Sequence, residues 1–227
     1  TVLILSDRGI DEEMAPIPSL LALSAVHNHL VREGTRTQVC LIIESGEPRE
    51  VMHFCLLIGY GASAVNPYLA IETLENLDQR GLLPAGTTFA AALKNFKKAV
   101  NKGLLKVFSK MGISTLQSYR GAQVFEAIGL SRKLVDKYFT GTASRIEGIC
   151  LDVIAEEARR KHAFAFTPMT DSDLELAVGG MYHYRTRGEY HLINPTTISK
   201  LQHAVQHNNF ANYQEYADHI NKQNRQL

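Results

Sequence analysis

The sequence predicts an α/β fold in which parallel strands alternate with helices, followed by a helical and irregular segment. Three observations support this prediction. Short apolar strands alternate with helices through short loops from residue 2 to residue 128, which is typical of parallel sheets and β/α barrels. The strand at residues 39–43 is continuously apolar, as expected of a parallel strand covered on both faces. Beyond residue 130 the alternation ends, and mostly helical or polar segments follow.

The alternating part begins with an apolar strand at residues 2–5, which a polar loop closes. A helix is predicted over 18–32, because its apolar residues recur at helical spacing and Gly34 follows it. After the strand at 39–43, Pro48 opens a helix that continues to about residue 58. The remaining elements predicted in this part are a strand at 63–66, a helix at 68–79, a helix at 88–110, a strand at 113–116 and a helix at 121–128.

The rest of the chain is predicted to be helical, with one polar, irregular stretch at residues 167–187. We therefore divide the chain into a β/α domain over 1–165 and a linker with helices over 166–227. Four strands are too few to close a barrel, since parallel closure takes eight, so the first part is expected to be an incomplete one. The helices predicted after residue 130 cover residues 134–139, 152–162, 199–206 and 213–221.

Composition excludes several classes of function. The 227 residues include 24 Lys and Arg against 23 Asp and Glu, and so weak a net charge argues against a nucleic-acid binder. Apolar runs are far shorter than the roughly 18 residues of a membrane span. The three cysteines, Cys40, Cys55 and Cys150, are too widely spaced for a disulfide framework or a zinc site, which favours a reducing compartment such as the cytoplasm.

Three patterns outside the strand ends favour structural roles. Gly59 and Gly61 flank Tyr60 after a helix, not after a strand, so they indicate a helix end more than a phosphate loop. His27 and His29 point about 200° apart on a helix and cannot share a metal ion. A basic stripe recurs every four residues on the helix at 88–110, and is expected to be a solvated face; it consists of Lys94, Lys98, Lys102, Lys106 and Lys110.

The predicted strand ends carry the candidate site. Because ligand sites in parallel α/β proteins collect at the carboxyl ends of strands, polar residues there are expected to line a rim or channel that meets a small polar ligand or another domain. Arg120 is the expected clamp for Glu44 or Asp7, since its guanidinium carries five donors in a rigid fork. The candidate residues are Asp7, Arg8, Glu44, Ser45, Asn66, Gln117, Ser118 and Arg120.

Several long strings resemble the large subunit of glutamate synthase, in the same order and over essentially the whole chain. They are ILSDRGI at 4–10, ESGEPRE at 44–50, IGYGA at 58–62, NPYLA at 66–70, GLLKV at 103–107, SKMGISTLQSYRGAQ at 109–123, FTGTASRI at 139–146 and GEYHLINP at 188–195. In that family an amidotransferase domain, a central domain, an FMN-binding barrel with an iron–sulfur cluster and a β-helix follow one another.

The resemblance implies a fold and a role. Residues 1–165 are similar to the latter part of the central domain, which in the family is a rudimentary version of a TIM barrel, and 166–227 to the lead-in to the FMN barrel. The segment would link the glutamine amidotransferase and synthase sites for glutamate formation from glutamine and 2-oxoglutarate, with a role in ammonia channelling. The implied partners are the other domains of the polypeptide, and a small NAD(P)H-oxidising subunit or ferredoxin.

The resemblance assigns no catalytic, cofactor-binding or metal residue to these 227 positions. The nucleophilic cysteine of the amidotransferase and the cysteine cluster for iron–sulfur are absent, so FMN and iron–sulfur are implied for the full-length enzyme only. We expect a non-catalytic segment without nucleic-acid or membrane partners, located in the cytoplasm, or in the plastid stroma if from a plant. The alternatives are a stand-alone small-molecule-binding α/β domain and a helical interaction module built on the basic stripe.

Overall fold

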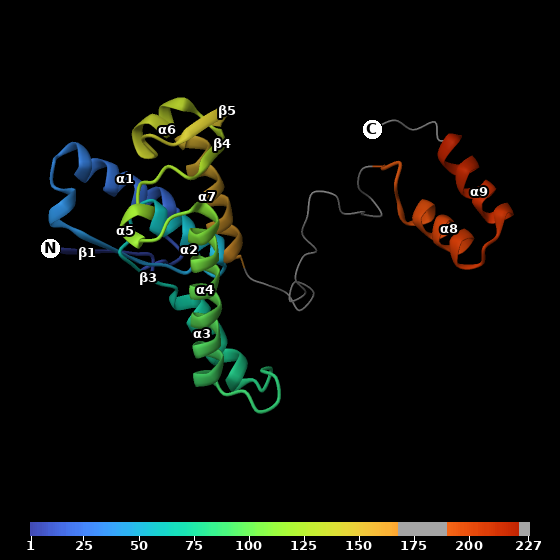
Figure 1. Ribbon diagram of the computed structural model, residues 1–227, viewed down its shortest axis with the longest axis horizontal. Coiled ribbons are helices and arrows are strands. Elements are labelled where there is room, and N and C mark those ends of the chain that lie inside the picture. Colours follow the sequence, from blue (N-terminus) through green and yellow to red (C-terminus); the bar gives the residue numbers. More distant parts are fainter. Residues whose placement is uncertain (168–189, 223–227) are drawn as a thin grey trace. The chain divides into compact units, whose positions relative to one another are not determined.

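The computed structural model describes residues 1–167 and 190–222, which belong to two compact units, Thr1–Thr167 and Pro168–Leu227 (Figure 1). In the first unit the elements are, in chain order, β1 (Val2–Ser6), α1 (Ser19–Arg32), the 3-10 helix η1 (Arg36–Gln38), β2 (Cys40–Glu44), α2 (Val51–Gly59), β3 (Ala64–Asn66), α3 (Tyr68–Gln79), α4 (Phe89–Met111), α5 (Leu116–Tyr119), β4 (Glu126–Leu130), α6 (Arg132–Tyr138), β5 (Ala143–Ile149) and α7 (Leu151–Ala165). No helix of the described residues combines the length and apolarity needed to cross a membrane.

The first three strands form the parallel sheet that the sequence predicts, in the order β1-β2-β3. The central strand β2 is apolar from Cys40 to Ile43, but its two faces are not equally buried. Leu41 and Ile43, which point to one face, are 0% and 1% exposed, whereas Cys40 and Ile42 on the other face are half-buried, so the predicted cover is complete on one face only. Leu23 of α1 and Leu57 of α2 pack into the same core. The burial of this strand therefore holds the two crossover helices against the sheet.

The long helix α4 confirms the helix predicted over 88–110. The Thr88 side chain accepts a hydrogen bond from the third residue of the helix, and Gly112 ends it in the left-handed conformation at φ 70°. Its basic stripe is exposed, as predicted, and the helix packs against α2 and α3. At Gly103 the α4 backbone comes so close to α2 that an added Cβ would lie 2.4 Å from a methyl carbon of Val51.

Two predictions between residues 113 and 130 are wrong. Residues 113–116 form no strand, because Thr115 caps the short helix α5 through its hydroxyl. Residues 121–128 form no helix: Gly121 and Gln123 have φ values of 71° and 55°, which interrupt a right-handed helix, and strand β4 follows. Strand β5, where no element was predicted, pairs with β4 in parallel.

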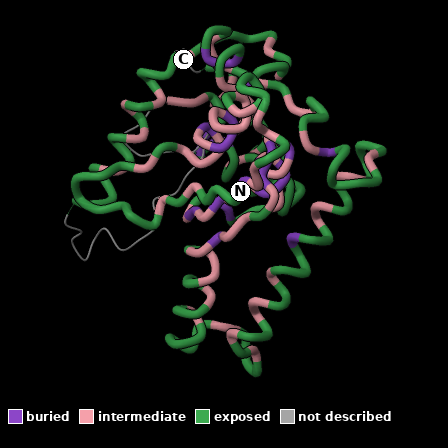
Figure 2. The backbone as a smooth tube through the Cα atoms, turned by 90° about the vertical axis from the view of Figure 1, so that its left-hand side faces the viewer, coloured by how far each residue is buried: buried purple, intermediate pink, exposed green. Residues whose placement is uncertain are grey.

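The described residues contain a three-stranded and a two-stranded parallel sheet, and no closed barrel. A second apolar cluster, formed by Leu21 of α1 with Leu134, Val135 and Phe139, packs α6 against α1. The helices predicted at 134–139 and 152–162 are confirmed as α6 and α7. Buried residues occur in short stretches separated by long exposed ones (Figure 2).

The second unit contains α8 (Pro195–Gln206) and α9 (Phe210–Asn221), which pack against each other. Asn194 opens α8 with a capping box: its side chain accepts hydrogen bonds from two backbone amides, and Thr197 Oγ1 accepts one from Asn194 N at 2.8 Å. Both helices were predicted, with later starts. The irregular stretch predicted at 167–187 lies, after Thr167, outside the described residues.

Candidate functional site

The polar groups predicted at the first three strand ends lie together on one edge of the sheet. Parallel pairing places Ser6 opposite Glu44 and Glu44 opposite Asn66, so the three strands end at the same level. The backbone extends this edge, since Asp7 N donates to the Glu44 carbonyl at 3.2 Å and Ser45 N to the Asn66 carbonyl at 3.1 Å. The predicted site residues that meet here are Asp7, Arg8, Glu44, Ser45 and Asn66.

Glu44, the last residue of β2, accepts hydrogen bonds from groups at the ends of the two flanking strands, β1 and β3. Its carboxylate accepts hydrogen bonds from Ser6 Oγ at 2.7 Å, from Arg8 Nε at 3.0 Å and from Asn66 Nδ2 at 3.1 Å. The Ser6 hydroxyl, followed by the Arg8 guanidinium, lowers the pKa of Glu44, because both favour the charged carboxylate. Glu44 is therefore an ionised anchor whose oxygens are already engaged.

Arg8 connects this anchor to α3. Its Nη1 lies 3.0 Å from Glu72 Oε1, and its guanidinium carbon lies 4.1 Å from the centre of the Tyr68 ring. The hydrogen bond to Glu44 is the main cause that raises the pKa of Arg8. Arg8 thus joins the end of β1 to β2 and to α3 by charge and by a cation–π contact.

Asp7 fixes the loop that follows β2. Its carboxylate accepts hydrogen bonds from the buried Ser45 hydroxyl and, at 3.1 Å, from Gly46 N. Burial, and then the hydrogen bond to Asp7, raise the pKa of Tyr68 to about 12. The Tyr68 hydroxyl is therefore protonated at neutral pH and acts as a donor to this carboxylate.

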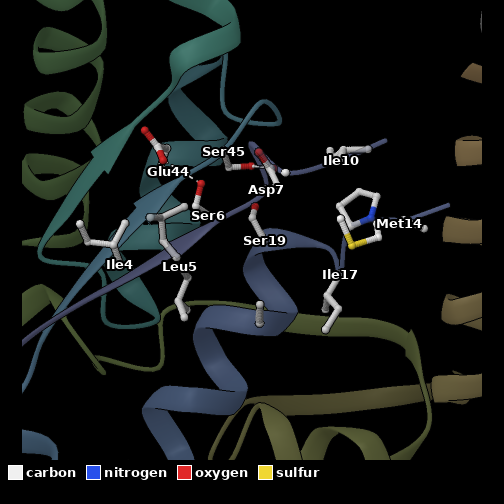
Figure 3. A pocket seen from close by; sticks show the side chains of 15 residues that line it. Ile4, Leu5, Ser6, Asp7, Ile10, Met14, Ile17, Ser19, Glu44 and Ser45 are labelled. Atoms are coloured by element: carbon white, nitrogen blue, oxygen red, sulfur yellow. Dashed lines mark hydrogen bonds between the residues drawn. The ribbon is translucent and has the colours of Figure 1, made fainter. Parts of the chain in front are cut away.

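A cavity of about 480 Å³ opens beside the rim. Ser6, Asp7, Glu44 and Ser45 gather on one side of it, whereas Ile10, Met14 and Ile17 supply an apolar wall (Figure 3). Both carboxylates at the rim already accept hydrogen bonds from neighbouring groups. The arrangement suits a rigid, preorganised wall that contacts a small ligand or another segment of protein.

Gln117 and Ser118 lie in the helix α5 and Arg120 directly follows it, so none of the three stands at a strand end. Ser118 belongs to α5 and accepts a hydrogen bond from the Thr115 hydroxyl at 2.8 Å. Arg120 follows α5 and lies near Arg36, which precedes β2 at the opposite edge of the sheet. The expected clamp of Arg120 on Glu44 or Asp7 is therefore wrong: Arg8 binds Glu44, and Ser45 with Gly46 binds Asp7.

Sequence reasoning missed three members of this network: Ser6, Tyr68 and Glu72. The sequence predicts that the first strand ends at residue 5, but Ser6 is the last residue of β1. Tyr68 and Glu72 lie four residues apart on the first turns of α3, so one helix face carries both toward Arg8. That spacing, directly after the third predicted strand, was the available signal.

The described residues do not fit an iron–sulfur cluster. Cys40 begins β2, Cys55 is buried within α2, and Cys150 is exposed in front of α7. No group of three or more His, Cys, Asp or Glu side chains in the described part of the chain is placed to hold a metal ion. A cluster with cysteine ligands would need thiolates gathered at one point, which this arrangement does not provide.

Residues 1–131 match the family model described as "Glutamate synthase central domain". The match covers more than half of the chain. The chain belongs to the glutamate synthase family. The family predicted from the sequence strings is thereby confirmed, and the α/β unit with its rim corresponds to the matched region, extended by α6, β5 and α7.

Curated relatives cover nearly the whole chain. It is 49% identical over 216 residues to the glutamate synthase [NADPH] large chain of Bacillus subtilis and 46% identical over 216 residues to the glutamate synthase [NADH] of Schizosaccharomyces pombe. It is 41% identical over 232 residues to the chloroplastic ferredoxin-dependent glutamate synthase of Spinacia oleracea. These matches cover 95%, 95% and 96% of the chain but only 14%, 10% and 14% of the relatives.

Proposed function

We propose that this chain is a structural segment of a glutamate synthase large subunit, linking the glutamine amidotransferase site to the FMN and iron–sulfur synthase site. In this proposal residues 1–165 are the latter part of the central domain, built as a partial β/α barrel, and 166–227 lead into the FMN-binding domain. The intact enzyme would be an oxidoreductase that forms glutamate from glutamine and 2-oxoglutarate. The rim would line or shape the route of ammonia between the two sites.

The observation that carries the proposal is the apolar surface that the described residues leave uncovered. β1 is an edge strand with Val2, Leu3 and Ile4 exposed, and on β4 and β5 the paired residues Ile128 and Ile146 are 70% and 60% exposed. Exposed edges and apolar patches favour association. The chain spans only about a tenth to a seventh of the length of its relatives. We therefore propose that other domains of the same polypeptide cover these exposed apolar residues.

The rim supports a positioning role over a catalytic one. The carboxylates of Asp7 and Glu44 are held by donors from neighbouring strands and loops, so their charges stabilise the sheet edge. FMN and the iron–sulfur cluster would then be held elsewhere in the intact enzyme, with a small NAD(P)H-oxidising subunit or ferredoxin as the electron source. The proposed location is the cytoplasm, or the plastid stroma in a plant.

Ile128→Lys tests the proposal in two contexts. In the 227-residue chain it should change the free energy of unfolding by less than about 0.5 kcal/mol, because the side chain is already exposed. In the intact large subunit it should cost about 1–2 kcal/mol or more, since burying most of an isoleucine contributes that much and a lysine would be buried instead. Glutamate formed per glutamine hydrolysed should fall as the domains separate.

Leu105→Lys is the matched control, because Leu105 is equally exposed but lies on the basic face of α4, between solvated lysines. It should have little effect in both contexts. If Ile128→Lys, like the control, changes the free energy of unfolding only slightly in both the isolated chain and the intact enzyme, the β4–β5 surface is ordinary solvent-exposed surface and the proposal is wrong.

A further inference from the structure

Arg36 is a half-buried cation whose hydrogen-bond partners are all neutral. Its Nε donates to His27 Nδ1 at 2.9 Å, Nη1 to the Val39 carbonyl at 2.6 Å and Nη2 to the Gly61 carbonyl at 2.7 Å. Burial lowers the pKa of His27, with Arg36 as a second cause, so this imidazole adds no charge at neutral pH. Arg36 is therefore fixed in place without a counter-ion.

Arg120 is a second cation at the same place. The Gly121 amide, which follows Arg120 in the chain, donates to the Gly59 carbonyl at 2.9 Å, and the Arg36 side chain donates to the Gly61 carbonyl. Arg36 and the backbone next to Arg120 therefore bind the two ends of one three-residue segment. The Nε atom of Arg120 is buried and has no hydrogen-bond partner in the described part of the chain. Buried polar atoms are almost always paired, so this one indicates an absent acceptor.

The charges at this edge of the sheet do not balance. Two guanidinium groups carry two positive charges, and the C-terminal end of α2 offsets only about half a charge through its carbonyls. No Asp or Glu side chain of the described residues forms an ion pair with Arg36 or Arg120. Burial, followed by repulsion from Arg120, lowers the pKa of Arg36, whereas the neighbouring Cys40 acts in the opposite direction.

We propose that Arg36 and Arg120 form a binding site for a carboxylate group. Guanidinium forks bind carboxylates in a bidentate manner, and Arg36 is already oriented by three hydrogen bonds. The carboxylate comes either from a free dicarboxylate or from an acidic side chain elsewhere in the intact glutamate synthase. Only the second source rests on the proposed function.

The first experiment uses the 227-residue chain with malonate as the probe, at constant ionic strength set with sodium chloride. Malonate should raise the Tm of the wild-type chain in a saturable manner. Arg120→Gln should weaken malonate binding at least about tenfold, because it removes charge-assisted hydrogen bonds. Without malonate, Arg120→Gln should raise the Tm slightly, since it removes repulsion from Arg36. Arg80→Gln, at the exposed end of α3, removes the same charge and should bind malonate as the wild type does.

Arg120→Lys keeps the positive charge but loses the planar guanidinium group, so it should bind malonate with intermediate affinity. This variant replaces Arg120→Gln in the test if the latter does not fold. Equal protection by malonate and chloride in the wild type, or equal malonate affinity in wild type, Arg120→Gln and Arg120→Lys, would overturn the proposal.

The second experiment uses the intact large subunit and separates the two sources. If an acidic side chain fills the site, malonate leaves the Tm of the intact enzyme unchanged and Arg120→Gln lowers it. If a free dicarboxylate fills the site, malonate raises the Tm of the intact enzyme and Arg120→Gln abolishes that rise. An intact enzyme that responds neither to malonate nor to Arg120→Gln contradicts the proposal, whatever the result for Ile128→Lys.

Discussion

Replacing Tyr119 tests how α5 is fixed to the first unit. This side chain is 0% exposed, and its ring centre lies 4.3 Å from that of Phe108 and 6.4 Å from that of Phe125. The hydroxyl donates to the Cys55 carbonyl at 3.3 Å, a long and neutral hydrogen bond. Tyr119→Phe keeps the ring contacts, so it should cost about 1 kcal/mol or less. Tyr119→Ala removes the ring and leaves a cavity, which typically costs about 3–5 kcal/mol.

Differential scanning calorimetry is the appropriate assay, because the two compact units can unfold in separate transitions. For a unit of 167 residues, a loss of about 1 kcal/mol lowers the Tm by roughly 2–4 °C, so Tyr119→Ala should lower it by about 10 °C. Phe164→Ala removes an aromatic side chain that is 75% exposed and should leave the Tm almost unchanged. If Tyr119→Phe destabilises as much as Tyr119→Ala, the hydroxyl and not the ring anchors α5, and the packing argument fails.

Two further predictions concern α4 and the rim. Gly103→Ala should lower the free energy of unfolding by about 1–3 kcal/mol, although alanine favours helices, because its Cβ would clash with Val51. Adding Val51→Ala to the same chain should restore most of the lost stability. If the two substitutions have additive effects in a double-mutant cycle, the clash is not the cause. Glu44 has a lowered pKa, so its contribution to stability is present above its ordinary value of 4.5 and is lost as the pH falls through the lowered value. The Tm difference between wild type and Glu44→Gln should therefore shrink below pH 4.5, and a constant difference from neutral to acidic pH would contradict this.

The sequence predicts the first 110 residues well because the signals there are local and agree with one another. The apolar run of β2 predicts a buried strand, and the strand is fully buried on the face of Leu41 and Ile43 and partly buried on the other. The amphipathic period of α4 is bounded by Thr88, which caps it, and by Gly112, which ends it in the left-handed conformation. Such signals depend on a few neighbouring residues only, so they can be recognised without knowledge of the tertiary structure.

The errors between residues 113 and 130 have the opposite cause. The run from Ile113 to Leu116 is short and contains β-branched residues, which favours a strand, yet Thr115 uses its hydroxyl to cap a helix of one turn. The stretch 121–128 is rich in helix-forming residues, yet its last three residues begin β4, because β5 supplies a hydrogen-bonding partner about 17 residues further along. Strand pairing over this distance leaves no local signal that periodicity can detect.

One of these errors explains why the predicted position of Arg120 is wrong. A strand advances about 3.3 Å per residue, so a strand of five residues separates its two ends by about 16 Å, more than an arginine side chain can span. Predicting a strand at 113–116 therefore placed Arg120 among the carboxylates, whereas the helix α5 places it at the other edge of the sheet, beside Arg36. The residue expected to neutralise an acid is thus next to a like charge. A like-charged pair costs stability unless an anion offsets it, and this reversal of environment is the reason to look for the missing carboxylate at Arg36 and Arg120 instead of at Glu44.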